Sequence, residues 1–235
     1  MERRRRCKAI GAQLILIEAA VETLDEAFAA KRAGADRIEL CANLSDGGTT
    51  PSAELIAAVV DQIELPVFVM IRPRGGGFVY SDDEIDAMTS DVEQIGRAGI
   101  AGIVTGVLTP DARVDVERTR ALVKAAAGLP VTFHRAFDSP VSLPDALEQL
   151  IDIGVSRVLT SGGAPTAPDG ASVIAALVGQ ARERIAIIAG GGIREHNVRE
   201  VIARTGVREV HSRLADEIGM RRLVDVIRTI PGVSF

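Results

Sequence analysis

Aromatic residues are scarce in this sequence, and their scarcity limits the partners the chain can have. Aromatic side chains make up 3% of the 235 residues, and tryptophan is absent. Surfaces that bind single-stranded nucleic acid are built largely from stacked aromatic side chains. A net charge of −5 also offers no clustered basic footprint. We therefore expect no nucleic-acid partner.

Cysteine and long apolar runs are also lacking. Cys7 and Cys41 are the two cysteines, which gives no disulfide framework and favours a reducing, cytoplasmic setting. No apolar stretch approaches the ~20 residues that span a bilayer. The apolar run at 14–17 is short and ends at Glu18, so we expect neither a signal peptide nor a membrane partner.

Lysine is rare, and this bears on cofactors. Lys8, Lys31 and Lys124 are the three lysines, and none falls on an inward strand position, which argues against a Schiff-base mechanism. No GxGxxG motif follows the first predicted strand, so no organic cofactor is expected.

Domain organisation follows from composition along the chain. The sequence opens with the basic run MERRRRCK, and we expect residues 1–12 to be a basic, disordered N-terminal segment. After it there is no linker, low-complexity tract or shift of composition. Residues 13–235 are therefore predicted to form one domain.

Short β-branched runs alternate with amphipathic stretches through the whole chain. The runs predict strands at 14–19, 37–41, 66–72, 102–106, 130–135, 157–161, 185–190 and 208–212. One helix-like stretch, 81–99, opens with Ser81 and Glu84 at the spacing of a capping box and closes on Gly99. This alternation predicts parallel strands joined by helices, and eight units favour a single (β/α)₈ TIM-type barrel, with slight irregularity allowed.

Polar residues recur where these strands end. Side chains alternate along a strand, and active sites of such barrels lie at the carboxyl ends of the strands. The predicted mouth contains Glu18, Glu39, Arg72, Thr105, His134, Ser161 and His211. Burying so many polar and ionisable groups together costs stability unless they pair, so we interpret them as an active or binding site. The alternative is a charged layer that is paired only for packing.

Glycine-rich turns add a hypothesis of anion binding. TSGG (160–163) and AGGGIRE (189–195) follow the sixth and seventh predicted strands, where backbone N–H groups can approach a ligand. The long loop at 71–84 could fold over the mouth. The candidate anion-binding residues are Arg74, Thr105, Arg135, Ser161, Gly162, Gly190, Gly191 and Gly192. The competing interpretation is a set of tight turns without a ligand.

These residues suit an enzyme that needs no cofactor. Glu18 and Glu39 would share acid–base work, with the pKa of one carboxyl raised by the other. His134 or His211 would shuttle a proton, and Arg72 with Arg135 would hold a carboxylate or an enolate. We thus hypothesise an isomerase or lyase acting on a small anionic or sugar-like substrate.

Six motifs, in order, make the chain similar to a known family. They are GADRIELCANLSDGGTTPS (34–52), IRPRGGGFVYSDDE (71–84), GIVTGVLTPDARVD (102–115), VTFHRAFD (131–138), RVLTSGG (157–163) and EVHS (209–212). Together they resemble the CutC family, named for copper homeostasis. The resemblance implies a TIM-type barrel, a cytoplasmic location, a homo-oligomer and copper(I) binding, with the metal or a small molecule as the ligand.

The copper(I) hypothesis depends on sulfur, because this ion prefers thiolate and thioether ligands. The resemblance implies that Cys41 is a metal ligand, assisted by His134, His211 or Met70. It also implies a further cysteine at the end of the first strand, where this chain has Ala19 and Ala20. Whether the protein is a metal-binding protein or an enzyme is left open by the sequence.

Overall fold

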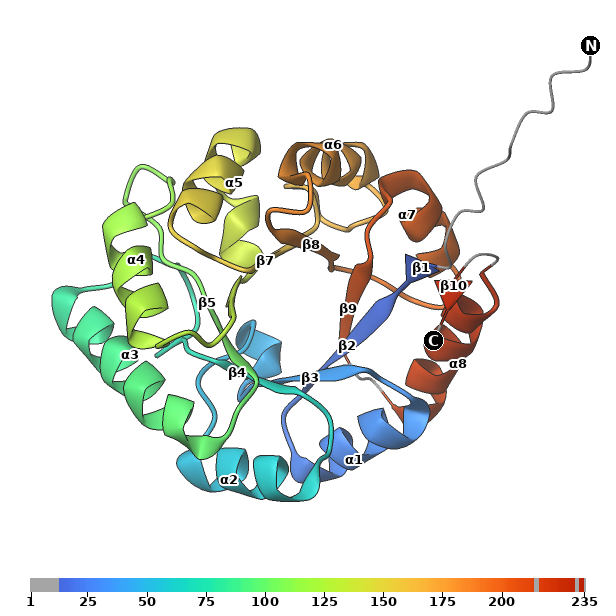
Figure 1. The fold of residues 1–235 in the computed structure, drawn as a ribbon, viewed down its shortest axis with the longest axis horizontal. Helices are drawn as coiled ribbons and strands as arrows, with labels where there is room; N and C mark the ends of the chain where they lie inside the picture. Colours follow the sequence, from blue (N-terminus) through green and yellow to red (C-terminus); the bar gives the residue numbers. More distant parts are fainter. Residues whose placement is uncertain (1–12, 214–215, 231–232, 235) are drawn as a thin grey trace, which may run out of the picture.

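Eight parallel strands close into a ring that is surrounded by helices (Figure 1). The computed structural model describes residues 13–213, 216–230 and 233–234. The ring contains, in chain order, β2 (Leu16–Val21), β3 (Arg37–Leu40), β4 (Val67–Met70), β5 (Gly102–Thr105), β6 (Val131–Phe133), β7 (Arg157–Thr160), β8 (Ala186–Ala189) and β9 (Glu209–Arg213). The pairing of β9 with β2 closes it. The predicted (β/α)₈ barrel is confirmed, and every predicted strand overlaps an observed one.

The helices form an outer layer around the ring (Figure 1). They are α1 (Leu24–Ala33), α2 (Ala53–Gln62), α3 (Asp82–Ile95), α4 (Val116–Ala125), α5 (Leu143–Asp152), α6 (Ala171–Ala181), α7 (Val198–Thr205) and α8 (Glu217–Arg228). The first and last of them, α1 and α8, lie side by side, so the outer layer closes as the strands do.

Short elements complete the fold. Three 3₁₀ turns, η1 (Leu44–Asp46), η2 (Gly96–Ala98) and η3 (Arg135–Asp138), lie within the connections. Outside the ring, β1 (Gln13–Leu14) pairs in parallel with β10 (Val233–Ser234). The segment 1–12, predicted to be disordered, lies outside the described residues, and the domain limits drawn from the sequence stay a prediction.

Local sequence signals set where helices begin. The hydroxyl of Ser81 accepts from the N–H of Glu84, and the Glu84 carboxylate accepts from the N–H of Ser81. This confirms the predicted capping box at the start of α3. Thr23, Ser52 and Asp115 cap α1, α2 and α4 in the same way with one side-chain oxygen each.

Because side chains alternate along each strand, the barrel has two buried regions. One lies between the strands and the helices, and the other lies inside the ring of strands. In β2, Ile17, Ala19 and Val21 pack against the helices in the main hydrophobic core. Glu18 and Ala20, which alternate with them, therefore face the inside of the ring. The inside is partly apolar, with Cys41, Phe68, Met70 and Val104 in contact, and partly charged. The charged part holds the candidate site.

Candidate functional site

A layer of paired charges crosses the inside of the barrel. Arg37 on β3 forms ion pairs with Glu18, at 3.4 Å, and with Glu209 on β9. Arg157 on β7 donates to the hydroxyl of Thr132 at 3.0 Å. Both guanidinium groups lie over the Phe68 ring, with Arg157 3.7 Å and Arg37 5.1 Å from its centroid. These cation–π contacts and ion pairs compensate part of the cost of burying the charges.

Above this layer, a histidine lies between two carboxylates. His211 Nδ1 lies 2.8 Å from Glu18 Oε1, and His211 Nε2 lies 3.7 Å from Glu39 Oε2. The adjacent pairing of β3, β2 and β9 brings the three side chains together. Among the described residues, these three form a group whose donor atoms all lie within 4.8 Å of one another, close enough for one metal ion.

Two sulfur-bearing side chains adjoin this group. The Cys41 thiol, which follows β3, donates to Glu39 Oε2 at 3.7 Å. Met70, at the end of β4, packs against Cys41 in the inner apolar cluster. Both face Gly48: a β-carbon at that glycine would lie 3.3 Å from Cys41 Sγ and 3.3 Å from Met70 Cε. Cys41 is not a member of the three-residue group, but it contacts that group through Glu39.

The surroundings shift the pKa values of Glu18 and Glu39 in opposite directions. Burial, the largest effect, raises the pKa of Glu39 to about 7, against the opposing charge of His211. Burial also acts on Glu18, but the hydrogen bond and charge of His211, with Arg37 and Arg157, bring its pKa below the usual value. Burial lowers the pKa of His211, yet the two carboxylates outweigh it and the net pKa is raised. The site thus holds a Glu18–His211 ion pair beside a carboxyl that titrates near neutrality.

The thiol of Cys41 is held in its protonated form. Burial, and then the nearby carboxylate of Glu39, raise its pKa well above the usual value. One oxygen of Glu39, Oε1, is buried without a hydrogen-bond partner in the described part of the chain. A buried acceptor left open in this way is unusual and favours a ligand at this point.

Arg72 and His134, also predicted at the mouth, form a second group. Arg72 donates to the carbonyl oxygens of Asp46, Gly48 and Gly76, so it fastens two loops together. The His134 ring accepts from Ala136 N–H through Nδ1. Burial and the charge of Arg72 lower the pKa of His134 to about 3, so this histidine is neutral and unsuited to carry a proton at pH 7.

Arg74 and Thr105 lie apart from the acid–base group. Arg74 forms an ion pair with Glu84 and donates to carbonyl oxygens of its own loop. Thr105 is fully buried, and its hydroxyl donates to the carbonyl oxygen of Ile71. Neither side chain forms a hydrogen bond or ion pair with Glu18, Glu39 or His211, and their roles in anion binding stay predictions.

Arg135 and the first glycine turn are organised by Asp138. Arg135 pairs with Asp138 and donates to Ser161 Oγ at 2.7 Å. Asp138 also accepts from the N–H groups of Ser161 and Gly163. Gly162 is packed so closely that an added β-carbon would lie 2.5 Å from the carbonyl oxygen of Gly170. This turn is therefore held in place by hydrogen bonds to Asp138.

The second glycine turn, which includes Gly190, borders an open pocket. A cavity of about 170 Å³ lies between the ends of β8 and β9. Gly191, Gly192, Arg135 and His211 are among the residues that line it. The pocket therefore joins the predicted anion-binding turn to the acid–base group.

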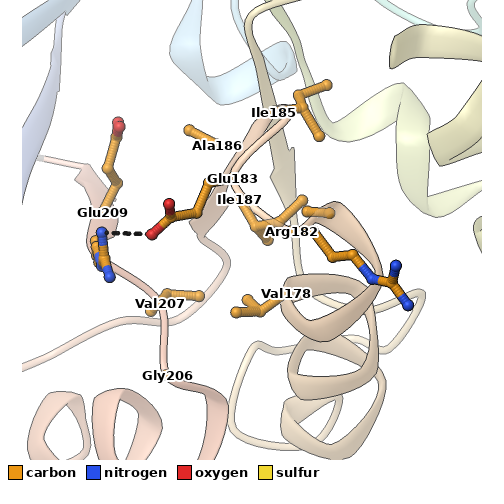
Figure 2. Close-up of a pocket in the computed structure, with 11 residues that line it drawn as sticks. Val178, Arg182, Glu183, Ile185, Ala186, Ile187, Gly206, Val207 and Glu209 are labelled. Carbon is orange, nitrogen blue, oxygen red and sulfur yellow. Dashed lines mark ion pairs between the residues drawn. The ribbon is translucent and has the colours of Figure 1, made fainter. Parts of the chain in front are cut away.

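Another pocket opens at the opposite, amino-terminal ends of the same strands (Figure 2). It has a volume of about 500 Å³ and includes Ile185, Ile187 and Val207 in its wall. Glu183 and Arg208 also line it and form an ion pair with a separation of 3.1 Å. None of the site residues predicted from the sequence lines this pocket.

Five residues near the site were absent from the predicted set: Arg37, Arg157, Arg194, Glu209 and Arg213. Alternation does place Arg37 on the face of Glu39 and Glu209 on the face of His211, although neither was chosen as a site residue. It could also have found Arg157, which shares a face with Ser161. Arg194 follows the glycine turn, and no strand periodicity reports where its side chain lies.

Comparisons with known proteins agree on one family. The model of the CutC family matches residues 15–215. The copper homeostasis protein cutC homolog of Homo sapiens is 44% identical over 216 residues, covering 91% of this chain and 79% of that protein. A CutC family protein of Xylella fastidiosa is 44% identical over 207 residues, covering 88% of this chain and 78% of the relative. The solved structure of CutC from Streptococcus agalactiae superposes with a TM-score of 0.80 at 36% identity, covering 84% of this chain and 98% of that one.

Proposed function

This chain belongs to the CutC family, and from that membership and the surroundings of Cys41 we propose that it serves copper homeostasis by binding copper(I) inside the barrel. One observation carries the proposal. The buried Cys41 thiol and the Met70 thioether both lie beside Gly48, and the thiol donates a hydrogen bond to Glu39.

The donor set suits a soft ion. Copper(I) prefers thiolate and thioether sulfur, and accepts imidazole nitrogen as a further ligand. Cys41 and Met70 would supply the sulfurs, and His211 would supply the nitrogen through Nε2, which faces Glu39. Copper is the cargo of the protein in this proposal.

Glu39 would accept the proton that copper(I) displaces from the Cys41 thiol. Because burial keeps the Cys41 thiol protonated, copper(I) must remove that proton to form a thiolate bond. Glu39 accepts the thiol hydrogen bond, and its pKa of about 7 lets it take up a proton near neutrality. Above pH 7 the displaced proton should stay on Glu39, whereas below pH 7, where Glu39 is already protonated, it should be released to solvent. Copper(I) binding should therefore strengthen as the pH rises toward 7.

The location and assembly state belong to the same proposal. The family resemblance implies a cytoplasmic homo-oligomer, and both points stay predictions. Among the described residues, no helix is long and apolar enough to cross a membrane.

Anaerobic titration of copper(I) against a competing chelator tests the proposal. The native protein should bind one equivalent tightly, and Cys41→Ser should abolish this binding. Cys7→Ser is the matched control, because it removes the other thiol of the sequence and should leave the affinity unchanged. Equal affinity in the native protein and Cys41→Ser would refute a role for this thiol.

A cofactor-independent isomerase or lyase is the second candidate function. The pKa of Glu39, about 7, favours it, because a general base works best when its pKa lies near the working pH. Under this alternative, Glu39→Gln should lose turnover of a small anionic or sugar-like substrate, whereas Cys41→Ser should retain it.

A further inference from the structure

The pocket between the ends of β8 and β9 is lined by three arginines. Arg135, Arg194 and Arg213 all contribute to its wall, and no carboxylate is among the described residues that line it. Arg135 is neutralised by Asp138, and Arg213 lies 3.5 Å from Glu22. The guanidinium of Arg194 donates to Ile193 O and Ser212 Oγ and has no acidic partner among the described residues. An anion would complete this charge balance.

The backbone of the glycine turn adds free donors to the same wall. Gly191 and Gly192 have φ values of 98° and 75°, a conformation that side-chain-bearing residues rarely adopt. Their N–H groups donate to no acceptor within the described part of the chain. The absence of a side chain also matters, since a β-carbon at Gly191 would lie 2.7 Å from Arg135 Nη1. Backbone N–H groups beside guanidinium groups are typical of phosphate sites.

The position and size of the pocket indicate the class of ligand. In chain order around the ring, β8 and β9 are the seventh and eighth strands, and barrels of this type commonly hold phosphate in the loops that follow them. The volume of about 170 Å³ is small compared with the roughly 300–1,000 Å³ of sites for drug-sized ligands. His211 lies in the pocket wall and connects it to Glu39.

We propose that this pocket binds a small phosphorylated metabolite, with its phosphate held by Arg194, Arg213 and the N–H groups of Gly191 and Gly192. The organic part of the ligand extends toward His211, which lines the same pocket. The pocket shares His211 with the proposed copper(I) site, but neither Cys41 nor Met70 is among its lining residues, so this inference does not rest on copper binding.

Isothermal titration calorimetry of the full-length, copper-free chain tests this site. The ligands are glycerol 3-phosphate, inorganic phosphate and glycerol, each at the same ionic strength. Glycerol 3-phosphate should bind at least as tightly as inorganic phosphate, and glycerol should not bind. Arg194→Gln and Arg213→Gln should each weaken binding by about tenfold or more, because each removes a charged hydrogen-bond donor.

Arg120→Gln is the matched control: Arg120 is an exposed residue of α4 and is not part of this pocket wall. It should bind glycerol 3-phosphate like the native protein. Unchanged affinity in both pocket variants, or equal weakening in the control, would overturn the site. Binding of inorganic phosphate without glycerol 3-phosphate would overturn the ligand class.

Discussion

His211 and Glu18 form an ion pair across the seam where the barrel closes. Their atoms Nδ1 and Oε1 lie 2.8 Å apart although the residues are 193 positions apart in sequence. They face each other in register on β9 and β2, the last and first strands of the ring. The acid–base group therefore forms only when the ring is complete.

Replacing His211 by Gln should destabilise the protein, because the buried Glu18 carboxylate would lose its nearer cationic partner and keep only the ion pair with Arg37. Removing one partner of a buried ion pair costs about 3–5 kcal/mol. Urea unfolding at pH 7 measures the loss. The double variant Glu18→Gln with His211→Gln should recover part of it, whereas strictly additive losses would show that the two side chains are not coupled.

Glu39 should make the stability of the barrel depend on pH. Its pKa is raised by burial from 4.5 to about 7 in the native state. Below pH 4.5 the Glu39 carboxyl is protonated in both the native and the unfolded protein. Between pH 4.5 and about 7 it is ionised in the unfolded chain but still protonated in the native protein. Its contribution to the free energy of unfolding is thus lost as the pH rises, by roughly 3 kcal/mol in all.

Glu39→Gln should abolish this part of the pH dependence, since an amide does not titrate. Urea unfolding from pH 4.5 to 8 should show the variant gaining stability relative to the native protein as the pH rises. Glu93→Gln, an exposed change on α3, is the control and should run parallel to the native protein. A Glu39→Gln curve that is also parallel would mean that Glu39 titrates normally.

Position 20 should accept a second thiol for copper(I), beside Cys41. Ala20 pairs in register with Glu39 and shares the inward face of Glu18, whereas Ala19 packs in the core against the helices. Ala20→Cys should therefore tighten copper(I) binding at least tenfold in a competition titration, at a stability cost of about 1–3 kcal/mol for the larger side chain.

Ala19→Cys is the matched control for that gain. It adds the same thiol one residue away, on the opposite face of β2, and should leave the affinity for copper(I) unchanged. If the two variants bind copper(I) equally well, the gain in affinity does not depend on the face of β2 that carries the added thiol. That result would contradict a copper(I) site inside the barrel.

Gly106 should tolerate no side chain, because His134 occupies the space beside it. A β-carbon at position 106 would lie 2.5 Å from Cε1 and 2.6 Å from Nδ1 of the His134 ring. Gly106→Ala should lower the free energy of unfolding by about 1–3 kcal/mol. Gly179→Ala in α6, where nothing lies within 4 Å, should instead stabilise by about 0.5–1 kcal/mol.

Periodicity in the sequence predicted the strands and the inward face of each. It correctly placed Glu18, Glu39 and His211 on one face of their strands, because side-chain alternation is a property of the strand itself. It could not give the height of each residue in the barrel, which depends on the stagger between strands. For that reason it grouped His134 with His211, although they lie in different groups with opposite pKa shifts.

Loop geometry was less accessible from the sequence. The glycine turn at 189–195 was recognised, but the position of the Arg194 side chain depends on its bonds to Ile193 and Ser212. Likewise, the sequence did not show that Arg74 forms an ion pair with Glu84 in the first turn of α3. Hydrogen bonds and ion pairs formed within the loops fix where these arginine side chains lie, and strand periodicity carries no information on them.

X-ray absorption at the copper edge, on protein loaded anaerobically with copper(I), tests the central claim most directly. A sulfur neighbour of copper in the native protein and in Cys7→Ser, reduced in Cys41→Ser, is the predicted result. A copper environment of nitrogen and oxygen alone, or one unchanged by Cys41→Ser, would contradict copper(I) binding by the Cys41 thiol.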